Sequence, residues 1–460
     1  MNAALQRVLR ALTLQGALGN SSSSLVGTYL PALALARGAT GYQIGLLTMV
    51  QSLASVLAQL PGAKLVDTFR SRKAIWLIGT AGQRLFWIPL ILVAFLPLPE
   101  PITIILIASG CAQFMTMLKT PAWTSLVADL VPLKIRGRYF GHRNTISGIA
   151  TVVVLSIGAF LVVWGFAPIL VLALVLGFAS LVITFSIPDL KLRRRYFYRP
   201  TFSVSWVTAQ RSFAVNRNFY WFTVFTMAFT IGDFVARPYY AVYMLNTLAI
   251  GFDWYGIAVA VGFLAGILSQ SYWGKMADRF GPRAILAVAC ILSTIVPLFW
   301  ILAQNRLAIL LLVAVDNFAL AGIGLASFIL LLGTSPHTRR TTFVARHTMA
   351  SEAAIVIGTF VGGLVLLSGG WFLSDLHLIF LISAAVSAVA LLALPFVKDL
   401  PSKRGDYSVY NTRNLFLELV AVSPVRSTVV RLRGNFASFR KQQFKRNERN
   451  YIYRARSSVW

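Results

Sequence analysis

The sequence predicts an all-α membrane protein whose twelve transmembrane helices form two six-helix halves. Of its 460 residues, 57% are hydrophobic and 12% are charged, and the mean hydropathy is +0.72. A soluble domain of this size needs more polar surface than this composition supplies. The apolar runs are long and continuous, whereas the strands of a membrane barrel alternate over about ten residues, so helices are favoured.

Twelve apolar windows, each near the length of about 20 residues that crosses a bilayer core, recur along the chain. In chain order they cover residues 12–36, 41–63, 74–97, 102–128, 144–166, 168–188, 219–247, 254–273, 284–303, 307–334, 348–369 and 376–397. The first window is retained despite its polar GNSSSS run, because it aligns without gaps onto the seventh window. In that register Gly19 falls on Gly232 and Tyr42 on Tyr255, an offset of 213 residues.

Basic residues gather in alternate loops of this predicted topology. The chain has 42 Lys and Arg against 14 Asp and Glu, and most of the cations, Arg143 among them, fall in the loops that follow even-numbered windows. The opposite loops hold only Arg37 and Arg306. By the positive-inside rule both termini lie in the cytoplasm, so the basicity reflects membrane topology and not nucleic-acid binding. We expect His347, which lies among these cations, to be solvated.

Two further pairs of segments repeat between the halves. AKLVDTFRSRK (63–73) matches GKMADRFGPR (274–283), and PLKIRGRYFGHRN (132–144) matches PHTRRTTFVARHT (336–348). Parallel repeats are typical of transporters that bind their substrate between the halves near the bilayer midplane. We therefore divide the chain into an N-terminal half (1–188), a cytoplasmic linker (189–218), a C-terminal half (219–397) and a basic tail (398–460).

The segment GKMADRFGPR resembles the signature between helices 8 and 9 of the major facilitator superfamily. The first-half copy keeps Asp67 and its basic run, but Ala63 and Arg70 stand where that family usually has glycine. The resemblance implies a secondary transporter that alternates access, with a cytoplasmic latch that favours the outward-facing state. A carboxylate at a helix end can accept hydrogen bonds from a neighbouring helix N-terminus. The predicted latch comprises Asp67, Arg72, Gly274, Asp278, Arg279, Gly281 and Arg283.

Topology alone explains the arginines of these loops but not the two acids at matching places. The resemblance also has limits. The fourth helix offers Lys119 where many proton-coupled members place arginine, and the proline-containing helix 5 pattern of many antiporters is absent. Antiport is therefore not supported by motif.

Ionisable residues inside the predicted membrane windows are the most informative set, because each costs about 2.5–3.5 kcal/mol at a helix centre unless it is paired or faces water. These residues are Arg84, Lys119, Asp233, Arg237 and Asp316, with Glu352 near the start of the eleventh window. Three cations against three anions indicate mutual pairing.

Asp233 and Arg237 lie four residues apart, so they share one helical face, and Pro238 interrupts the helix just beyond them. In one interpretation this face lines a wet cavity, with Asp233 as a proton or cation site and Arg237 holding a substrate anion. In the other, the pair is an internal salt bridge. The resemblance implies that helices 1 and 7 line the cavity. The predicted cavity residues are Asp233, Arg237, Tyr239, Tyr240, Tyr243, Asn20, Arg84, Asp316 and Asn317, although a polar residue such as Asn317 can equally form an interhelical hydrogen bond.

Motifs for chemistry on a substrate are missing from the sequence. It contains no HExxH, no GxSxG and no glycine-rich phosphate loop, and Cys111 and Cys290 lie in separate windows. We therefore predict no enzymatic activity, no cofactor and no metal site.

The predicted function is secondary transport of a small organic solute across the inner membrane of a bacterium, with proton coupling as one hypothesis. The basic tail carries fourteen Lys and Arg, which suits contact with anionic lipid. The alternative is a non-transporting module of the same fold that docks lipid or a protein partner through this tail.

Overall fold

The structure is a computed structural model that describes residues 3–69, 71–131, 136–188, 217–335, 340–367 and 375–398. Every element within these ranges is helical. The predicted linker up to residue 216 and the predicted tail from residue 399 lie outside them, and so does the side chain of Asp67.

The N-terminal half is built from long helices joined by short connections. In order they are α1 (Ala3–Ala36), α2 (Gly41–Phe69), the consecutive α3 (Arg72–Leu85) and α4 (Trp87–Phe95), α5 (Pro101–Leu130), α6 (Arg136–Leu161) with the short η2 (Val162–Trp164), and α7 (Ala167–Phe185).

The C-terminal half repeats this plan. It contains α9 (Arg217–Ala236) with its continuation α10 (Tyr239–Val242) and the π-helix η4 (Tyr243–Thr247), then α11 (Phe252–Phe280), α12 (Pro282–Leu302), α13 (Arg306–Thr334), α14 (Arg340–Leu367) and α15 (Asp375–Leu391) with η6 (Leu394–Phe396).

Eleven segments in the described part of the chain are long and apolar enough to cross a membrane. The long helix outside this set is α1, because Asn20 and the four serines after it lower its hydropathy. The structure thus supports an all-helical, multi-pass membrane protein with eleven candidate spans, one fewer than the sequence windows predict.

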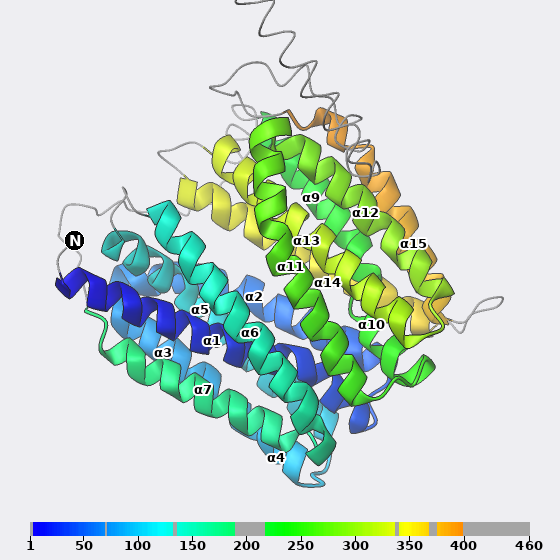
Figure 1. Ribbon diagram of the computed structural model, residues 1–460, viewed down its shortest axis with the longest axis horizontal. Coiled ribbons are helices and arrows are strands. Elements are labelled where there is room, and N and C mark those ends of the chain that lie inside the picture. The colour runs from blue at the N-terminus through cyan, green and yellow to red at the C-terminus, as the bar shows by residue number, and fades with distance from the viewer. Residues whose placement is uncertain are drawn as a thin grey trace, which may run out of the picture. The chain divides into compact units, whose positions relative to one another are not determined.

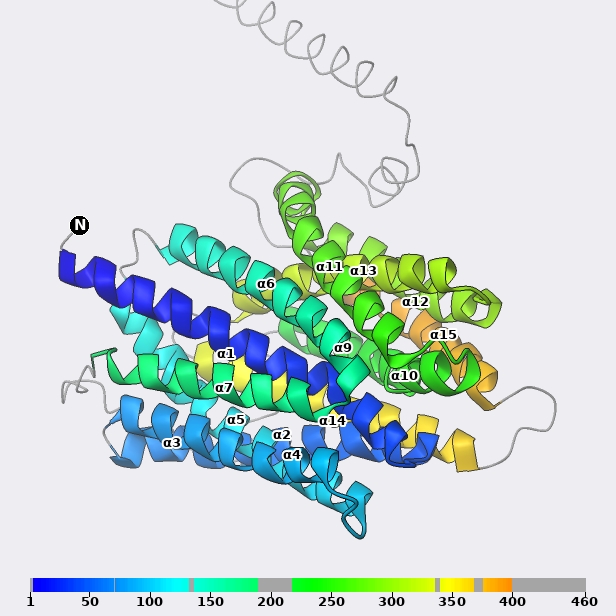
Figure 2. The ribbon, with the colours of Figure 1, turned by 60° about the horizontal axis from the view of Figure 1, so that its bottom comes forward.

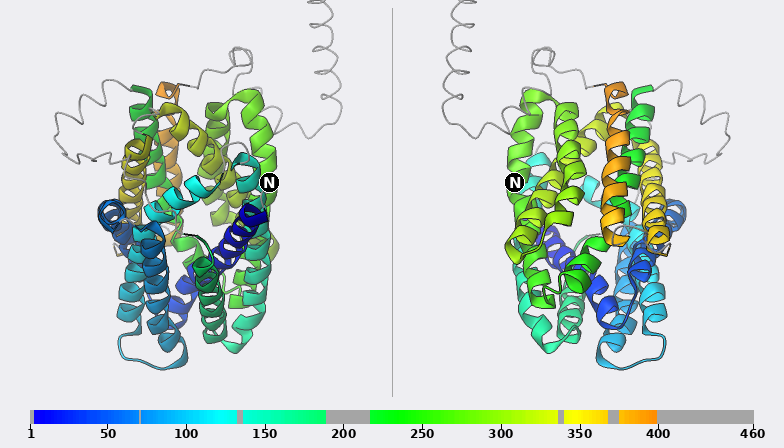
Figure 3. Two further views of the ribbon diagram at one scale, coloured as in Figure 1. Left: turned by 90° about the vertical axis from the view of Figure 1, so that its left-hand side faces the viewer. Right: turned by 90° about the vertical axis from the view of Figure 1, so that its right-hand side faces the viewer.

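The two halves touch mainly through two pairs of helices, α2 against α14 and α6 against α11. Figure 1 shows the N-terminal half in blue to light green, with α7 last, and the C-terminal half in green to orange. The halves converge where α1 ends and diverge toward the end where α1 begins. The turned views in Figure 2 and Figure 3 show the same pairing of helices. We call the end where α1 terminates the closed end, and the opposite end the open end.

At the closed end, a tyrosine on α1 of the N-terminal half fills the space between the two halves. Tyr29 is 1% exposed, and its hydroxyl donates to the Leu155 carbonyl of α6 at 3.3 Å. Its ring lies against Gly158 of α6 and reaches Gly256 of α11 in the other half, where a Cβ would collide with the tyrosine. Helices of both halves therefore approach closely around one side chain.

Tyr239 on α10 repeats this arrangement from the C-terminal half. It is fully buried, and its hydroxyl donates to the Thr359 carbonyl of α14 at 3.1 Å. Its ring contacts Gly362 of α14 and Gly45 of α2, again without room for a Cβ. The acceptor carbonyls of the two tyrosines are 204 residues apart (Leu155 and Thr359), which is the offset of the predicted 132–144 and 336–348 repeat.

The predicted offset of 213 between α1 and α9 holds at Gly19 and Gly232. Each glycine faces a serine on the last long helix of its own half, Ser180 of α7 or Ser387 of α15. Two to three turns further on the offset is different, because the two sealing tyrosines, Tyr29 and Tyr239, are 210 residues apart. The change falls where Pro238 separates α9 from α10, and the offset is 213 again at Tyr42 and Tyr255, beyond the π-helix η4.

Candidate functional site

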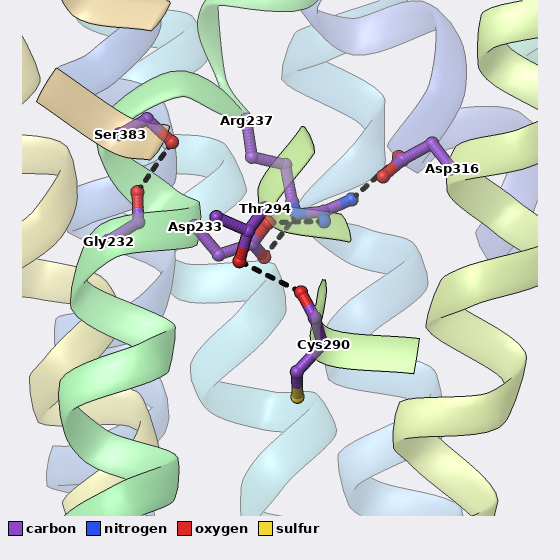
Figure 4. A network of polar contacts seen from close by, with 7 residues as sticks. All are labelled: Gly232, Asp233, Arg237, Cys290, Thr294, Asp316 and Ser383. Carbon is purple, nitrogen blue, oxygen red and sulfur yellow. Dashed lines mark hydrogen bonds and ion pairs between the residues drawn. The ribbon is translucent and has the colours of Figure 1, made fainter. Parts of the chain in front are cut away.

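One arginine joins two carboxylates in the middle of the C-terminal half. Arg237 follows the last turn of α9, and its guanidinium binds both oxygens of Asp233, with Nε donating to Oδ2 at 2.7 Å and Nη2 to Oδ1 at 2.6 Å. Its remaining nitrogen, Nη1, donates to Asp316 Oδ2 of α13 at 3.2 Å. Figure 4 shows the guanidinium pointing between the two acids. We call these residues the Arg237 triad.

The triad carries one more negative charge than positive charge. The side chains of Asp233 and Asp316 are 12% and 10% exposed, and that of Arg237 is 20% exposed. Asp233 receives two short, parallel hydrogen bonds, whereas Asp316 receives one longer bond from the arginine. The carboxylate of Asp316 is therefore the less fully compensated of the two.

Aromatic side chains form one wall beside the triad. Tyr240, on the turn after Arg237, stacks on Trp300 of α12 with ring centroids 4.9 Å apart, and Phe380 of α15 lies 5.5 Å from it. Tyr243 continues this wall and bonds to Nε2 of His377 at 3.2 Å. Sequence reasoning found the tyrosines but missed Trp300 and Phe380, because nothing in the sequence shows which aromatics of other helices face α10.

Backbone carbonyls and hydroxyls hold the helices around the triad in place. Ser383 of α15 donates to the Gly232 carbonyl of α9 at 2.7 Å, next to Asp233. Thr294 of α12 donates to the Cys290 carbonyl at 2.8 Å, as Figure 4 shows. The first bond fixes α9 against α15, and the second lies within α12. The triad is therefore surrounded by packed helices.

The other predicted cavity residues lie apart from the triad. Tyr239 belongs to the closed-end seal. The Asn317 amide donates to the Val313 carbonyl one turn back on its own helix α13 and lies against Gly262 of α11. Asn20 is exposed in the middle of α1. Arg84 lies inside the N-terminal half. The structure thus brings together Asp233, Arg237 and Asp316 with Tyr240 and Tyr243 nearby, and places the rest elsewhere.

A second polar cluster occupies the N-terminal half. Lys119 of α5 donates to Gln83 Oε1 of α3 at 2.6 Å, and Gln83 Nε2 lies 3.5 Å from Ser23 Oγ of α1. Arg84 is 1% exposed, covers the ring of Trp87 at 4.1 Å from its centroid, and lies against Gly177 of α7. Its Nε and Nη1 atoms are buried without a hydrogen-bond partner.

Two residues expected in solvated loops are buried instead. Arg143 is 6% exposed on α6, where its guanidinium covers Trp123 of α5 and fits against Gly16 of α1. His347 is 8% exposed on α14 and stacks on Phe222 of α9 with centroids 5.0 Å apart. Both expectations were wrong, because the helices α6 and α14 begin earlier than the sequence windows and carry these residues inside the bundle.

Comparison with known proteins agrees with this architecture. The sequence model of the Major Facilitator Superfamily matches the chain twice, over residues 12–236 and 226–440. The chain belongs to the major facilitator superfamily. Members of this superfamily are secondary transporters, so the protein is a transporter of small molecules and not an enzyme. A search of curated proteins finds no match.

Several solved transporters share the fold of this superfamily member. A mutant of the nucleoside transporter NupG is 16% identical, with a TM-score of 0.65 over 86% of this chain and 100% of that one. The xylose transporter XylE from E. coli, in an inward-open conformation, is 14% identical with a TM-score of 0.64 over 88% and 98%. A bacterial homologue of the iron transporter ferroportin, in an inward-facing state, is 14% identical with a TM-score of 0.64 over 86% and 99%.

The predicted latch of the transporter lies at the open end. Gly281 joins α11 to α12 with a φ of 84°, a left-handed conformation that favours glycine. Arg283 donates to the Pro395 carbonyl at 3.4 Å, and Arg279 lies over Phe280. Asp278 is exposed and Gly274 has open space around it. In the first-half copy Arg72 is 4% exposed and donates to the Ser125 carbonyl at 3.0 Å, so it ties α3 to α5.

Proposed function

We propose that the protein is a proton-coupled secondary transporter of a small organic solute, with Asp316 as the coupling carboxylate. The observation that carries this proposal is the Arg237 triad, in which two buried carboxylates share one arginine. An excess negative charge is costly inside a membrane protein, and binding a proton removes it. Asp316 is the acid held by the single, longer hydrogen bond, so it can accept the proton with the smaller loss of contacts.

We further propose that the open end faces the cytoplasm and that α1 is the twelfth span. The basic loops around Arg72 and Arg283 belong to the open end, as the positive-inside rule requires of a cytoplasmic surface. α1 has 34 residues and packs along α6 and α7, which cross the membrane by length and composition. On this orientation both termini are cytoplasmic and the tail from residue 398 is available to anionic lipid, consistent with a bacterial inner membrane protein.

Alternating access requires that the closed end can open. The closed-end seal consists of two tyrosines, Tyr29 and Tyr239, that fit against glycines of the opposite half rather than binding them through charged groups. Such contacts separate without leaving a buried ion unpaired. We propose that rocking of the halves breaks this seal while the latch loops of the open end come together, as expected for repeats that move as rigid bodies.

The coupling proposal is tested by proton flux into liposomes. Wild type, Asp316→Asn and Asp233→Asn are reconstituted in vesicles that contain a pH-sensitive dye, and a panel of metabolites is added outside. A solute that drives proton movement in wild type should do so weakly or not at all in Asp316→Asn. Solute uptake without any proton movement in wild type would contradict the coupling, and full proton movement in Asp316→Asn would contradict the assignment to that residue.

A further inference from the structure

The N-terminal half contains two neighbouring cations, one buried and one half-buried, that have no acidic partner among the described residues. Lys119 is half-buried and donates to Gln83, the residue that precedes Arg84 on α3, and Arg84 is 1% exposed. Among the described residues, neither cation lies within salt-bridge distance of a carboxylate. Arginine keeps its charge at any physiological pH, so this positive charge needs a source of compensation.

Protein groups fix these cations but do not neutralise them. The Gln83 amide oxygen accepts from Lys119, and the ring of Trp87 covers one face of the Arg84 guanidinium. Gly177 allows that guanidinium to fit, because a Cβ there would lie 2.4 Å from Nε. The Nε and Nη1 donors of Arg84 still have no acceptor. These two N–H groups point in different directions, so each can donate a separate charge-assisted hydrogen bond to a carboxylate or phosphate oxygen.

We infer that Arg84 and Lys119 form an oxyanion site that takes the carboxylate or phosphate group of the transported solute. The inference rests on the proposed function, and it follows from the difference between the halves. Arg237 already uses Nε, Nη1 and Nη2 for Asp233 and Asp316, so it has little capacity left for a substrate anion. The N-terminal pair has both free donors and uncompensated charge.

A polar surface beside the pair provides a route for the anion. Thr120 and Thr124, one and two turns along the face of α5 that begins at Thr116, are exposed. Asn20 of α1, one turn from Ser23, is exposed as well. The two threonine hydroxyls bond to carbonyls of their own helix, but an exposed asparagine amide at membrane depth is expected to face water rather than lipid. The cluster of Ser23, Gln83 and Lys119 therefore adjoins a wet surface.

The site is tested with inorganic phosphate and acetate as probes. Full-length protein is placed in nanodiscs of phosphatidylcholine alone, and its unfolding temperature is measured against each anion at fixed pH, with chloride holding the ionic strength constant. Lys119→Gln removes one cation, Lys119→Arg keeps the charge, and Arg143→Gln is the matched control because Arg143 is also buried over a tryptophan. Tryptophan fluorescence gives a local readout, since Arg84 covers Trp87.

Wild type should show a saturable rise in unfolding temperature that chloride does not reproduce. Lys119→Gln should weaken the apparent affinity by about tenfold or more, while Lys119→Arg and Arg143→Gln stay near wild type. The fluorescence change should disappear in Trp87→Phe. No saturable effect of either anion on wild type, or equal affinity in Lys119→Gln, would overturn the site.

Two further measurements separate this inference from a lipid-binding site and from the proposed proton coupling. If phosphatidylglycerol in the nanodisc competes with phosphate, a lipid headgroup takes the site and the assignment to the solute is overturned. Asp316→Asn should keep the phosphate response, because Asp316 belongs to the other half. Failure of proton coupling with an intact phosphate response would therefore count against the proposed function alone.

Discussion

The two halves of this transporter share their framework but differ in how they handle buried charge. Gly19 and Gly232 each receive a serine from the last long helix of their half, and Tyr29 and Tyr239 each bond to an equivalent carbonyl. In the C-terminal half, however, Arg237 is bound by two acids. In the N-terminal half, Arg84 and Lys119 have no acid at all in the described part of the chain.

This difference shows that the residues that pack the helices repeat between the halves, whereas the charged residues do not. The paired glycines and tyrosines keep matching places because they determine how closely helices approach, and both halves need the same approach. The charged residues follow no such repeat. The C-terminal half compensates its cation internally and holds a spare negative charge, whereas the N-terminal half leaves positive charge for something outside the protein. A proton suits the first site and an anionic group suits the second.

The largest expected effect comes from replacing Arg237 by methionine. The change leaves two carboxylates buried together, which should destabilise the protein by about 3–5 kcal/mol. SDS-induced unfolding in mixed micelles measures the loss, with Arg306→Met as the control because Arg306 is exposed at the closed end. A loss below about 1 kcal/mol would show that the triad is solvated, like a surface ion pair.

Alanine at Gly158 or Gly362 tests whether the seal is equivalent in the two halves. A Cβ at Gly158 would lie 2.8 Å from the Tyr29 ring. One at Gly362 would lie nearest the Val235 carbonyl oxygen and 2.6 Å from the Tyr239 ring, so Gly362→Ala should be the costlier of the two. Each substitution should cost about 1–3 kcal/mol by overpacking. Gly324→Ala is the control, because open space surrounds Gly324 and alanine favours helix. If only one of the two variants loses stability, the symmetry of the seal is broken.

Arg84→Met should behave in the opposite way to Arg237→Met. It removes a buried cation that has no acidic partner, so stability should stay the same or rise by up to about 1 kcal/mol. The same unfolding assay measures both variants side by side. A loss as large as that of Arg237→Met would mean that the protein itself compensates Arg84, and the contrast between the halves would then disappear.

The smallest effect is expected from the serines that tie the last helix of each half to the first. Ser22 donates to the Ala173 carbonyl at 2.6 Å, and Ser383 donates to the Gly232 carbonyl at 2.7 Å. Alanine at either position should cost about 0.6 kcal/mol, the usual value for such a bond between membrane helices. Unequal losses of more than about 1 kcal/mol between the two variants would argue against a shared framework.

Sequence patterns predicted the features that depend on spacing within one helix. The pairing of Asp233 with Arg237 follows from their separation of four residues, and the break near Pro238 follows from its missing N–H. The pairing of Arg237 with Asp316 depends instead on how α9 faces α13, a contact 79 residues apart in the chain. Intramembrane charges indicated that some pairing exists but not which acids take part.

Features set by packing between helices were harder to predict. Nothing in the sequence distinguishes buried Arg143 from its loop neighbours, because its place depends on the gap that Gly16 leaves and on the ring of Trp123. The bond from Lys119 to Gln83 requires the register of α5 against α3. The change of repeat offset at Tyr239 lies between the proline break and the π-helix, and a gapless alignment cannot represent such a change.

The most direct test of the central claim is to observe the proton on Asp316. Infrared difference spectra of wild type, Asp316→Asn and Asp233→Asn, recorded between alkaline and acidic pH, report carboxyl groups that become protonated. We predict a protonated-carboxyl band on acidification in wild type that persists in Asp233→Asn and is absent from Asp316→Asn. A band that persists in Asp316→Asn and disappears in Asp233→Asn would show that the account assigns the coupling proton to the wrong carboxylate.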